Sequence, residues 1–277
     1  MKLLYKFLFE VIPPNLQNKL GKSSLLKPLR DAILRPSGSF AVSAVEIEKK
    51  YFNYDINFKY FASAKIALKA KKRGVENTLL KNTIELLRKY KSIKDDCVVI
   101  DVGTNFGFLS MVWALSSCKN GFVHGFEANK KVYNTFRSTI EHNRINNIVL
   151  NYNAVGKKNE EVKIYDMDTT SNVNNQNISN QFNMVDMISL DYYIKEKEIK
   201  RCDLVKIDVD GIEFEIINGG LDLLKNLKPI FVIETNNDRR IVDFFKKNDY
   251  SVLDMELNLF SDSNVLPPNI FCVPKTL

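Results

Sequence analysis

The chain has 277 residues, 45% of them hydrophobic and 26% charged, and these values exclude a disordered or fibrous protein. It contains no apolar stretch of about 18 residues, so the sequence predicts no transmembrane helix. Its four cysteines lie far apart and it has only two histidines, which argues against a structural zinc site. We expect buried, reduced thiols in a cytoplasmic protein.

Positive charge is concentrated in the N-terminal third. Residues 1–97 contain 20 Lys and Arg against 9 Asp and Glu, a net charge of +11, whereas residues 98–277 have a net charge of −4. Such a segment fits either an ordinary lysine-rich surface or contact with an anionic acceptor or membrane. No basic motif with interleaved aromatic residues is present, so nucleic acid is not an expected partner.

The first third of the chain shows no regular alternation of elements. Proline and glycine divide its start into short helical pieces, of which residues 1–9 are expected to form an amphipathic helix. Residues 40–62 are rich in β-branched and aromatic residues, which predicts a pair of strands, and residues 76–91 have helical spacing. We therefore expect a basic α+β extension, 1–75, followed by a domain over 76–277.

From residue 97 onward, apolar strands alternate with amphipathic helices. The expected strands are 97–100, 121–126, 147–153, 204–207 and 229–233. The expected helices are 106–117, 130–144, 212–225 and 239–248, with a polar loop insert over 169–183. Strands 250–256 and 269–273 are expected to form a closing hairpin. The alternation predicts a doubly wound α/β sheet, which binds ligands beyond the C-terminal ends of its strands.

A glycine-rich turn follows the first of these strands, in V-V-I-D-V-G-T-N-F-G (98–107). Gly103 and Gly107 would let the backbone approach a ligand, and the next helix offers free N–H groups. The D-x-G-x-x-x-G spacing differs from the dinucleotide fingerprint G-x-G-x-x-G. Asp101 would repel a pyrophosphate but suits a positively charged ligand group, such as the α-ammonium of S-adenosylmethionine. A tight turn without a ligand is the alternative.

Glu127 ends the next expected strand, 20 residues after Gly107. A carboxylate at this place can accept hydrogen bonds from both hydroxyls of a ribose. The spacing suits NAD and S-adenosylmethionine equally, so it does not distinguish between them. The alternative is a surface carboxylate that the dipole of the following helix stabilises.

Carboxylates are concentrated in L-V-K-I-D-V-D-G-I-E (204–213), at the end of a central strand. Repulsion among Asp208, Asp210 and Glu213 is costly unless they serve a ligand, a metal or a proton transfer. We expect a functional role for Asp208 and helix capping for Asp210, with Glu213 three residues later. Glu234, which ends the next strand, is expected beside them. The segment has too few oxygens for a full calcium or magnesium shell, so no metal is expected.

These motifs together resemble those of the FkbM-type S-adenosylmethionine-dependent methyltransferases. The similar segments are V-V-I-D-V-G-T-N-F-G-F-L-S (98–110), G-F-E (125–127), N-A-V-G (153–156), I-S-L-D (188–191), L-V-K-I-D-V-D-G-I-E (204–213) and L-K-P-I-F-V-I-E (227–234). Asp210 stands where the family signature K-I-D-V-E-G-x-E has glutamate. The resemblance implies a Rossmann-like class I methyltransferase sheet with a C-terminal β-hairpin. It also implies O-methylation of a hydroxyl on a sugar, glycan or related metabolite.

The resemblance implies roles around the methyl donor. Four residues would shape the pocket for its methionine part: Asp101, Gly103, Asn105 and Gly107. Glu127 would hold the ribose, and Asn153 with Ala154 would flank the adenine.

The same resemblance implies a place for the chemistry. Asp208 is the candidate general base or acceptor-orienting group, and Glu234 is the second candidate. Lys206 lies two residues before Asp208, on the same face of a strand. Its ammonium group would stabilise developing oxyanion charge or pair with a carboxylate.

The expected cofactor is S-adenosylmethionine, and the expected partner is a small-molecule, sugar or lipid-linked glycan acceptor. The basic extension would help to form the acceptor side, with residues 1–9 resting near the inner face of a membrane. The alternative is a structural cap that only covers the edges of the sheet. Two other classes stay open: a catalytically idle S-adenosylmethionine-binding module, and a nicotinamide-dependent sugar oxidoreductase.

Overall fold

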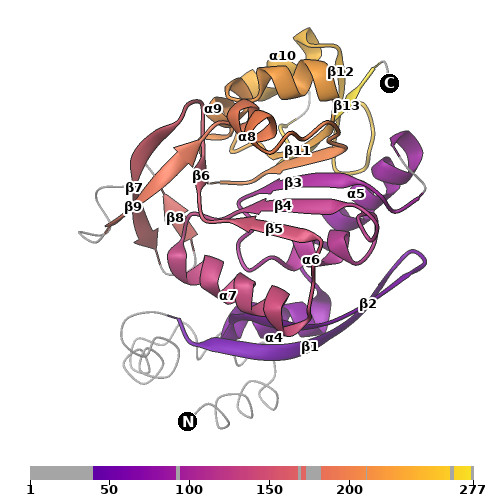
Figure 1. Cartoon of the computed structure of the whole chain (residues 1–277). Helices are drawn as coiled ribbons and strands as arrows, with labels where there is room; N and C mark the ends of the chain where they lie inside the picture. Colours follow the sequence, from indigo (N-terminus) through magenta and orange to yellow (C-terminus); the bar gives the residue numbers. More distant parts are fainter. Residues whose placement is uncertain are drawn as a thin grey trace.

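The computed structural model describes residues 40–91, 94–167, 170–172, 182–209, 211–262 and 265–275. Its central sheet consists of β3 (Val98–Val102), β4 (Phe122–Phe126), β5 (Ile148–Asn151), β10 (Leu204–Ile207), β11 (Ile230–Glu234), β12 (Tyr250–Leu253) and β13 (Asn269–Pro274). The strand order is β12-β13-β11-β10-β3-β4-β5 (Figure 1). Neighbours from β11 to β5 are parallel, and β13 is antiparallel to both of its neighbours. The chain order reverses between β3 and β10, which is where such sheets bind ligands.

Helices cover both faces of this sheet (Figure 1). One face packs against α8 (Leu190–Glu196), α9 (Glu213–Asn218) and α10 (Arg239–Lys247). The other packs against α5 (Asn77–Tyr90), α6 (Phe108–Ala114) and α7 (Lys130–His142). The predicted doubly wound α/β sheet is therefore confirmed, and the antiparallel pairing of β12 with β13 confirms the closing hairpin.

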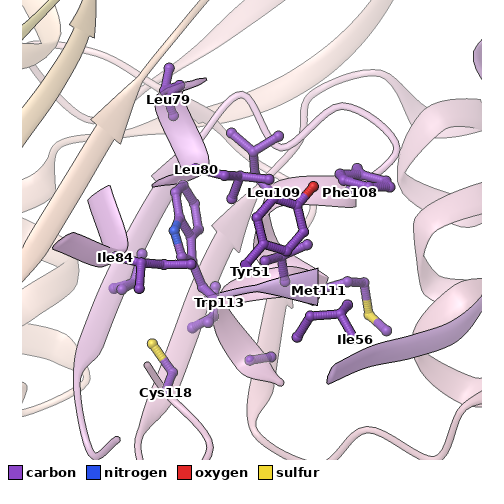
Figure 2. Packing of buried hydrophobic residues seen from close by; sticks show 14 of the residues in the cluster. Tyr51, Ile56, Leu79, Leu80, Ile84, Phe108, Leu109, Met111, Trp113 and Cys118 are labelled. Carbon is purple, nitrogen blue, oxygen red and sulfur yellow. The ribbon is translucent and has the colours of Figure 1, made fainter. Parts of the chain in front are cut away.

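The predicted strand pair is the antiparallel hairpin β1 (Val42–Tyr51) and β2 (Tyr54–Ser63). A helix that the sequence analysis missed, α4 (Ala64–Arg73), follows it directly. Figure 2 shows Tyr51 and Ile56 of the hairpin packed with apolar side chains of α5 and α6. Within this core the indole of Trp113 donates a hydrogen bond to the Thr83 hydroxyl over 3.0 Å. The hairpin thus shares a core with the domain expected over residues 76–277, and the boundary at residue 75 stays a prediction.

A second sheet takes up both described ends of the expected loop insert. It consists of β6 (Ala154–Val155), β7 (Glu160–Met167), β8 (Thr170–Asn172) and β9 (Phe182–Ile188), in the order β6-β9-β7-β8. The loop prediction over 169–183 is therefore wrong at both of its ends. β8 is a polar edge strand, so it lacks the apolar alternation that marks a half-buried strand.

The prediction of one continuous helix over 212–225 is also wrong. It divides into α9 and a π-helical turn, η2 (Leu223–Leu227). Gly219 and Gly220 lie between them, and a Cβ on Gly219 would lie 2.3 Å from the carbonyl oxygen of Gly156. Close packing of two backbone segments therefore requires glycine where the helical pattern would otherwise continue.

Three predictions lie outside the described residues: the short helical pieces before residue 40, among them the helix over 1–9, the interior of the loop insert over 173–181, and the capping role of Asp210. All four cysteines are buried, and none of them forms a disulfide. In the described part of the chain, no helix is long and apolar enough to cross a membrane.

Candidate active site

A cavity of about 320 Å³ opens at the C-terminal ends of β3, β4 and β10. Eight of the ten predicted site residues line it: Asp101, Gly103, Asn105, Glu127, Asn153, Ala154, Lys206 and Asp208. Gly107 and Glu234 are not among the lining residues. Cavities of this size commonly hold small ligands and combine apolar walls with a few polar groups.

Asp101, near the end of β3, is fully buried at the base of the cavity. Its Oδ2 accepts a hydrogen bond from the Ser110 hydroxyl over 2.5 Å. Its Oδ1 has no hydrogen-bond partner, although the Lys206 ammonium lies 3.4 Å away. Burial raises the pKa of Asp101, and Lys206 opposes that rise. A buried carboxylate oxygen with unused acceptor capacity fits a cationic ligand group.

The turn after β3 depends on two glycines with positive φ, +79° at Gly103 and +76° at Gly107. Gly103 lines the cavity, and its N–H donates to the carbonyl of Phe126 over 3.1 Å. A Cβ on Gly107 would lie 2.1 Å from the ring of Phe136 on α7. The structure therefore places helix packing, rather than the cavity wall, beside Gly107.

Glu127 joins the turn after β3 to the start of α7. Its Oε2 accepts from the backbone N–H of Asn105 over 2.9 Å, and its Oε1 accepts from that of Asn129 over 2.8 Å. Burial raises the pKa of Glu127 to about 7, against the lowering effect of these two hydrogen bonds. The carboxylate is thus held at the cavity with a fixed orientation, as a ribose-binding group would require.

The expected adenine side lies where β5 leads into β6. Asn153 and Ala154 both line the cavity, and the Asn153 side-chain amide donates to the carbonyl of Asp186 over 3.1 Å. Ala154 packs in a small core with Ile164 of β7, which lines the cavity as well. Ile164 was missed because its strand lies next to the polar segment interpreted as a loop. The second sheet therefore adds an apolar wall that suits a flat heterocycle.

Lys206 is buried between two carboxylates. Its Nζ lies 3.2 Å from Asp208 Oδ2 and 3.4 Å from Asp101 Oδ1, and it donates to the carbonyl of Gly103 over 3.3 Å. Burial disfavours the ammonium form, but these carboxylates outweigh it and raise the pKa of Lys206. The lysine therefore links the ends of β3 and β10 as a permanent cation.

Asp208 stays ionised in this setting. Burial opposes ionisation, but Lys206 and a hydrogen bond with Glu234 together hold the pKa of Asp208 below its usual value. Glu234 at the end of β11 therefore lies beside Asp208, as expected. The side-chain amide of Asn236 donates to Glu234 Oε2 over 3.5 Å.

Glu213, one of the carboxylates concentrated after β10, has a structural role. Its Oε1 accepts from the backbone N–H groups of Val209 and Gly211, over 3.2 and 3.1 Å, and from the Asn236 side chain over 2.9 Å. The buried carboxylate thus stabilises the loop that follows Asp208. Among the described residues, no group of His, Cys, Asp and Glu side chains is arranged to hold a metal ion.

Comparison with known proteins decides the family. The model of the methyltransferase FkbM domain matches residues 101–252, from Asp101 across the sheet to β12. The chain belongs to the FkbM methyltransferase family. The methyl donor of this family is S-adenosylmethionine, and its fold is the Rossmann-like class I methyltransferase fold. Asp101 and Glu127 remain the groups expected to bind the donor's ammonium and ribose, and both line the cavity.

Solved structures with a similar arrangement are distant in sequence. The methyltransferase FkbM of Methylobacillus flagellatus KT is 15% identical with a TM-score of 0.46, over 64% of this chain and 44% of that one. The match thus spans less than half of that protein. Precorrin-6y C5,15-methyltransferase of Geobacter metallireducens GS-15 is 15% identical with a TM-score of 0.40, over 73% and 90%. An rRNA methylase of Streptococcus thermophilus is 11% identical with a TM-score of 0.40, over 70% and 93%. No functionally curated protein matches the sequence.

We expect Glu127→Ala to weaken S-adenosylmethionine binding by about 1.5–3 kcal/mol, the usual contribution of hydrogen bonds to a charged group. Folding should survive, because the carboxylate lies at the cavity and not in an apolar core. Calorimetric titration of the folded variant measures the change. Unchanged affinity would refute the ribose role.

The pKa of Glu127, about 7, also predicts a pH dependence. Only the ionised carboxylate accepts hydrogen bonds from both ribose hydroxyls, and it becomes protonated as the pH falls through 7. Lowering the pH from 8 to 6 should therefore reduce donor affinity about tenfold in the wild type. Glu127→Gln removes this titration but not that of the donor's own groups, so the two proteins should differ in slope. Equal slopes would contradict the prediction.

Proposed function

We propose that the protein is an S-adenosylmethionine-dependent O-methyltransferase that acts on a hydroxyl of a sugar, glycan or related metabolite. One observation supports this most directly. The donor-side groups Asp101 and Glu127 and the strand-end carboxylate Asp208 line the same cavity. A hydroxyl beside Asp208 would then be close to a donor whose ribose is held by Glu127, and such alignment is the main requirement of methyl transfer.

Bound S-adenosylmethionine supplies a methyl group activated by attachment to a sulfonium centre. The acceptor oxygen forms the new C–O bond with a lone pair, and the electrons of the broken C–S bond pass to sulfur. Asp208 accepts the hydroxyl proton in this scheme. Its low pKa makes it a weak base. A weak base suffices because an oxygen that is gaining a third bond is strongly acidic.

Lys206 supports Asp208 in this role. The ion pair over 3.2 Å orients the carboxylate, and the ammonium keeps it ionised in a partly buried site. Glu234 holds the other side of Asp208 through a hydrogen bond. This arrangement positions one charged oxygen acceptor at the end of β10, as an acceptor-orienting group needs.

The acceptor side is formed by the N-terminal part of the chain. Tyr60 of β2 and Lys69 of α4 line the cavity together with the residues of the sheet. Lys65, Lys69 and Lys72 are exposed and follow helical spacing along one side of α4. This basic strip supports an anionic or lipid-linked acceptor, which the protein would meet in the cytoplasm or at the inner face of a membrane.

The test combines binding with turnover. Purified full-length protein is titrated with S-adenosylmethionine and then incubated with methyl-labelled donor and a set of hexoses, hexose phosphates and nucleotide sugars. Label in an alkali-stable methyl ether supports the proposal, and a KM for the acceptor that rises with salt supports an anionic acceptor. Tight donor binding with transfer to none of these acceptors favours an idle binding module instead.

A further inference from the structure

One wall of the cavity comes from the segment that joins α4 to α5. Glu76 lines the cavity just before α5 and has a φ of +47°, in the left-handed region. For a residue other than glycine this conformation costs about 1–2 kcal/mol. Neighbours maintain it: the Tyr51 hydroxyl donates to Asn77 Oδ1 over 2.7 Å, and the Asn77 side-chain amide donates to the carbonyl of Arg73. These contacts stabilise the turn from which Glu76 lines the cavity.

Glu76 faces the end of the cavity where β3 and β10 terminate. It interacts electrostatically with Lys206, Asp208 and Asp101. The side chain is accessible to solvent because it opens onto the cavity, yet enclosure by the protein raises its pKa, and Lys206 opposes that rise. A positively charged ligand group beside Glu76 would favour the ionised form of its carboxylate.

Carboxyl groups outnumber ammonium groups along the wall of the cavity. Lys206 pairs with Asp101 and Asp208, whereas Glu76 lines the same cavity with no ion pair to it. Among the described residues that line the cavity, the other cation is Lys69, which is exposed. The cavity therefore has more carboxyl groups than lysines to pair with them, and a cationic ligand group beside Glu76 would favour its ionised form.

We propose that Glu76 binds the methylsulfonium charge of S-adenosylmethionine, so that the site holds the donor more tightly than its product S-adenosylhomocysteine. The inference rests on the donor orientation proposed above, with the adenine beside Asn153 and the ribose on Glu127. In that orientation the sulfonium, which is bonded to the ribose, would lie on the side of the cavity that Glu76 lines, with Asp101 left to the α-ammonium and Asp208 to the acceptor. Methyl transfer converts the cationic sulfonium to a neutral thioether. The attraction to Glu76 therefore ends when the product has to leave.

Calorimetric titration of the full chain with each of the two ligands tests the proposal without any acceptor. Glu76→Gln should weaken S-adenosylmethionine binding about fivefold, as for a partly exposed charge pair, and leave S-adenosylhomocysteine binding within about twofold. Glu48→Gln, the same change at an exposed site on β1, should alter neither. Glu76→Asn tests the charge with a residue that tolerates the left-handed conformation. Retained S-adenosylhomocysteine binding shows that each variant is folded.

Two results would overturn the assignment of Glu76. One is an unchanged ratio of the two affinities in both Glu76 variants. The other is an equal loss of both ligands, which would indicate a general structural role. Neither result would touch the proposed function, because the wild type would still bind the donor. A wild type that binds neither ligand would contradict both proposals together.

Discussion

Replacing Asp208 with asparagine should lower the rate of methyl transfer by about 10²–10⁴-fold and leave S-adenosylmethionine binding nearly unchanged. Asparagine keeps the shape of the side chain but cannot accept the hydroxyl proton. The Lys206 ammonium would retain Asp101 at 3.4 Å, so the donor side of the cavity should persist. Single-turnover rates with saturating donor, together with donor titrations, separate these two effects.

Glu234→Gln is the matched comparison for this prediction. Both acidic residues lie at the ends of neighbouring strands with their side chains together, yet Asp208 lines the cavity and Glu234 is not among the lining residues. We expect a smaller loss for Glu234→Gln, because it would act only by positioning Asp208. If turnover barely changes in Asp208→Asn while Glu234→Gln abolishes it, the base is Glu234.

Strand-end residues could be predicted from sequence because parallel strands share one carboxyl edge. Asp101 and Asp208 each follow a run of apolar residues and Glu127 follows β4, and the structure brings all three to one cavity. Local pattern was enough for this, since the topology of a doubly wound sheet fixes which strand ends meet.

The N-terminal wall of the cavity could not be predicted in the same way. Tyr60, Lys69 and Glu76 belong to a hairpin, an unpredicted helix and a turn, and none of them stands in a motif. Their proximity to Lys206 depends on tertiary packing of the hairpin core, which no spacing in the sequence records. Only Gly74 indicated an element here, because glycine often follows the last residue of a helix. It has a φ of +76°, directly after α4 and two residues before Glu76.

The acidic residues near Asp208 show a second limit of prediction from sequence. The sequence predicted a functional role for Asp208 and a capping arrangement of Asp210 with Glu213, but not the hydrogen-bond partners of Glu213. The structure shows that Glu213 accepts backbone N–H groups of the following loop, which is a structural use of a buried acid. Sequence could not separate these roles, because both place acidic residues at a helix start.

Gly103→Ala should destabilise the protein by about 2–5 kcal/mol, the sum of an unfavourable positive φ and overpacking against backbone. Gly103 has a φ of +79°, and a Cβ there would lie 2.0 Å from the carbonyl oxygen of Asp208. Backbone cannot move aside as a flexible side chain can. The turn that is expected to hold the donor would therefore shift relative to the strand end that is expected to hold the acceptor. Chemical denaturation measures the loss of stability.

Gly211→Ala is the control that isolates the steric part of this effect. Gly211 has a φ of +108°, but among the described residues, its chain neighbours aside, a Cβ there would meet no atom within 4 Å. It should therefore show only the conformational cost, about 1–2 kcal/mol. If the two variants lose equal stability, contact with Asp208 contributes nothing. A folded Gly103→Ala protein with full donor affinity and full turnover would show that close contact between the donor turn and the β10 strand end is not needed for catalysis.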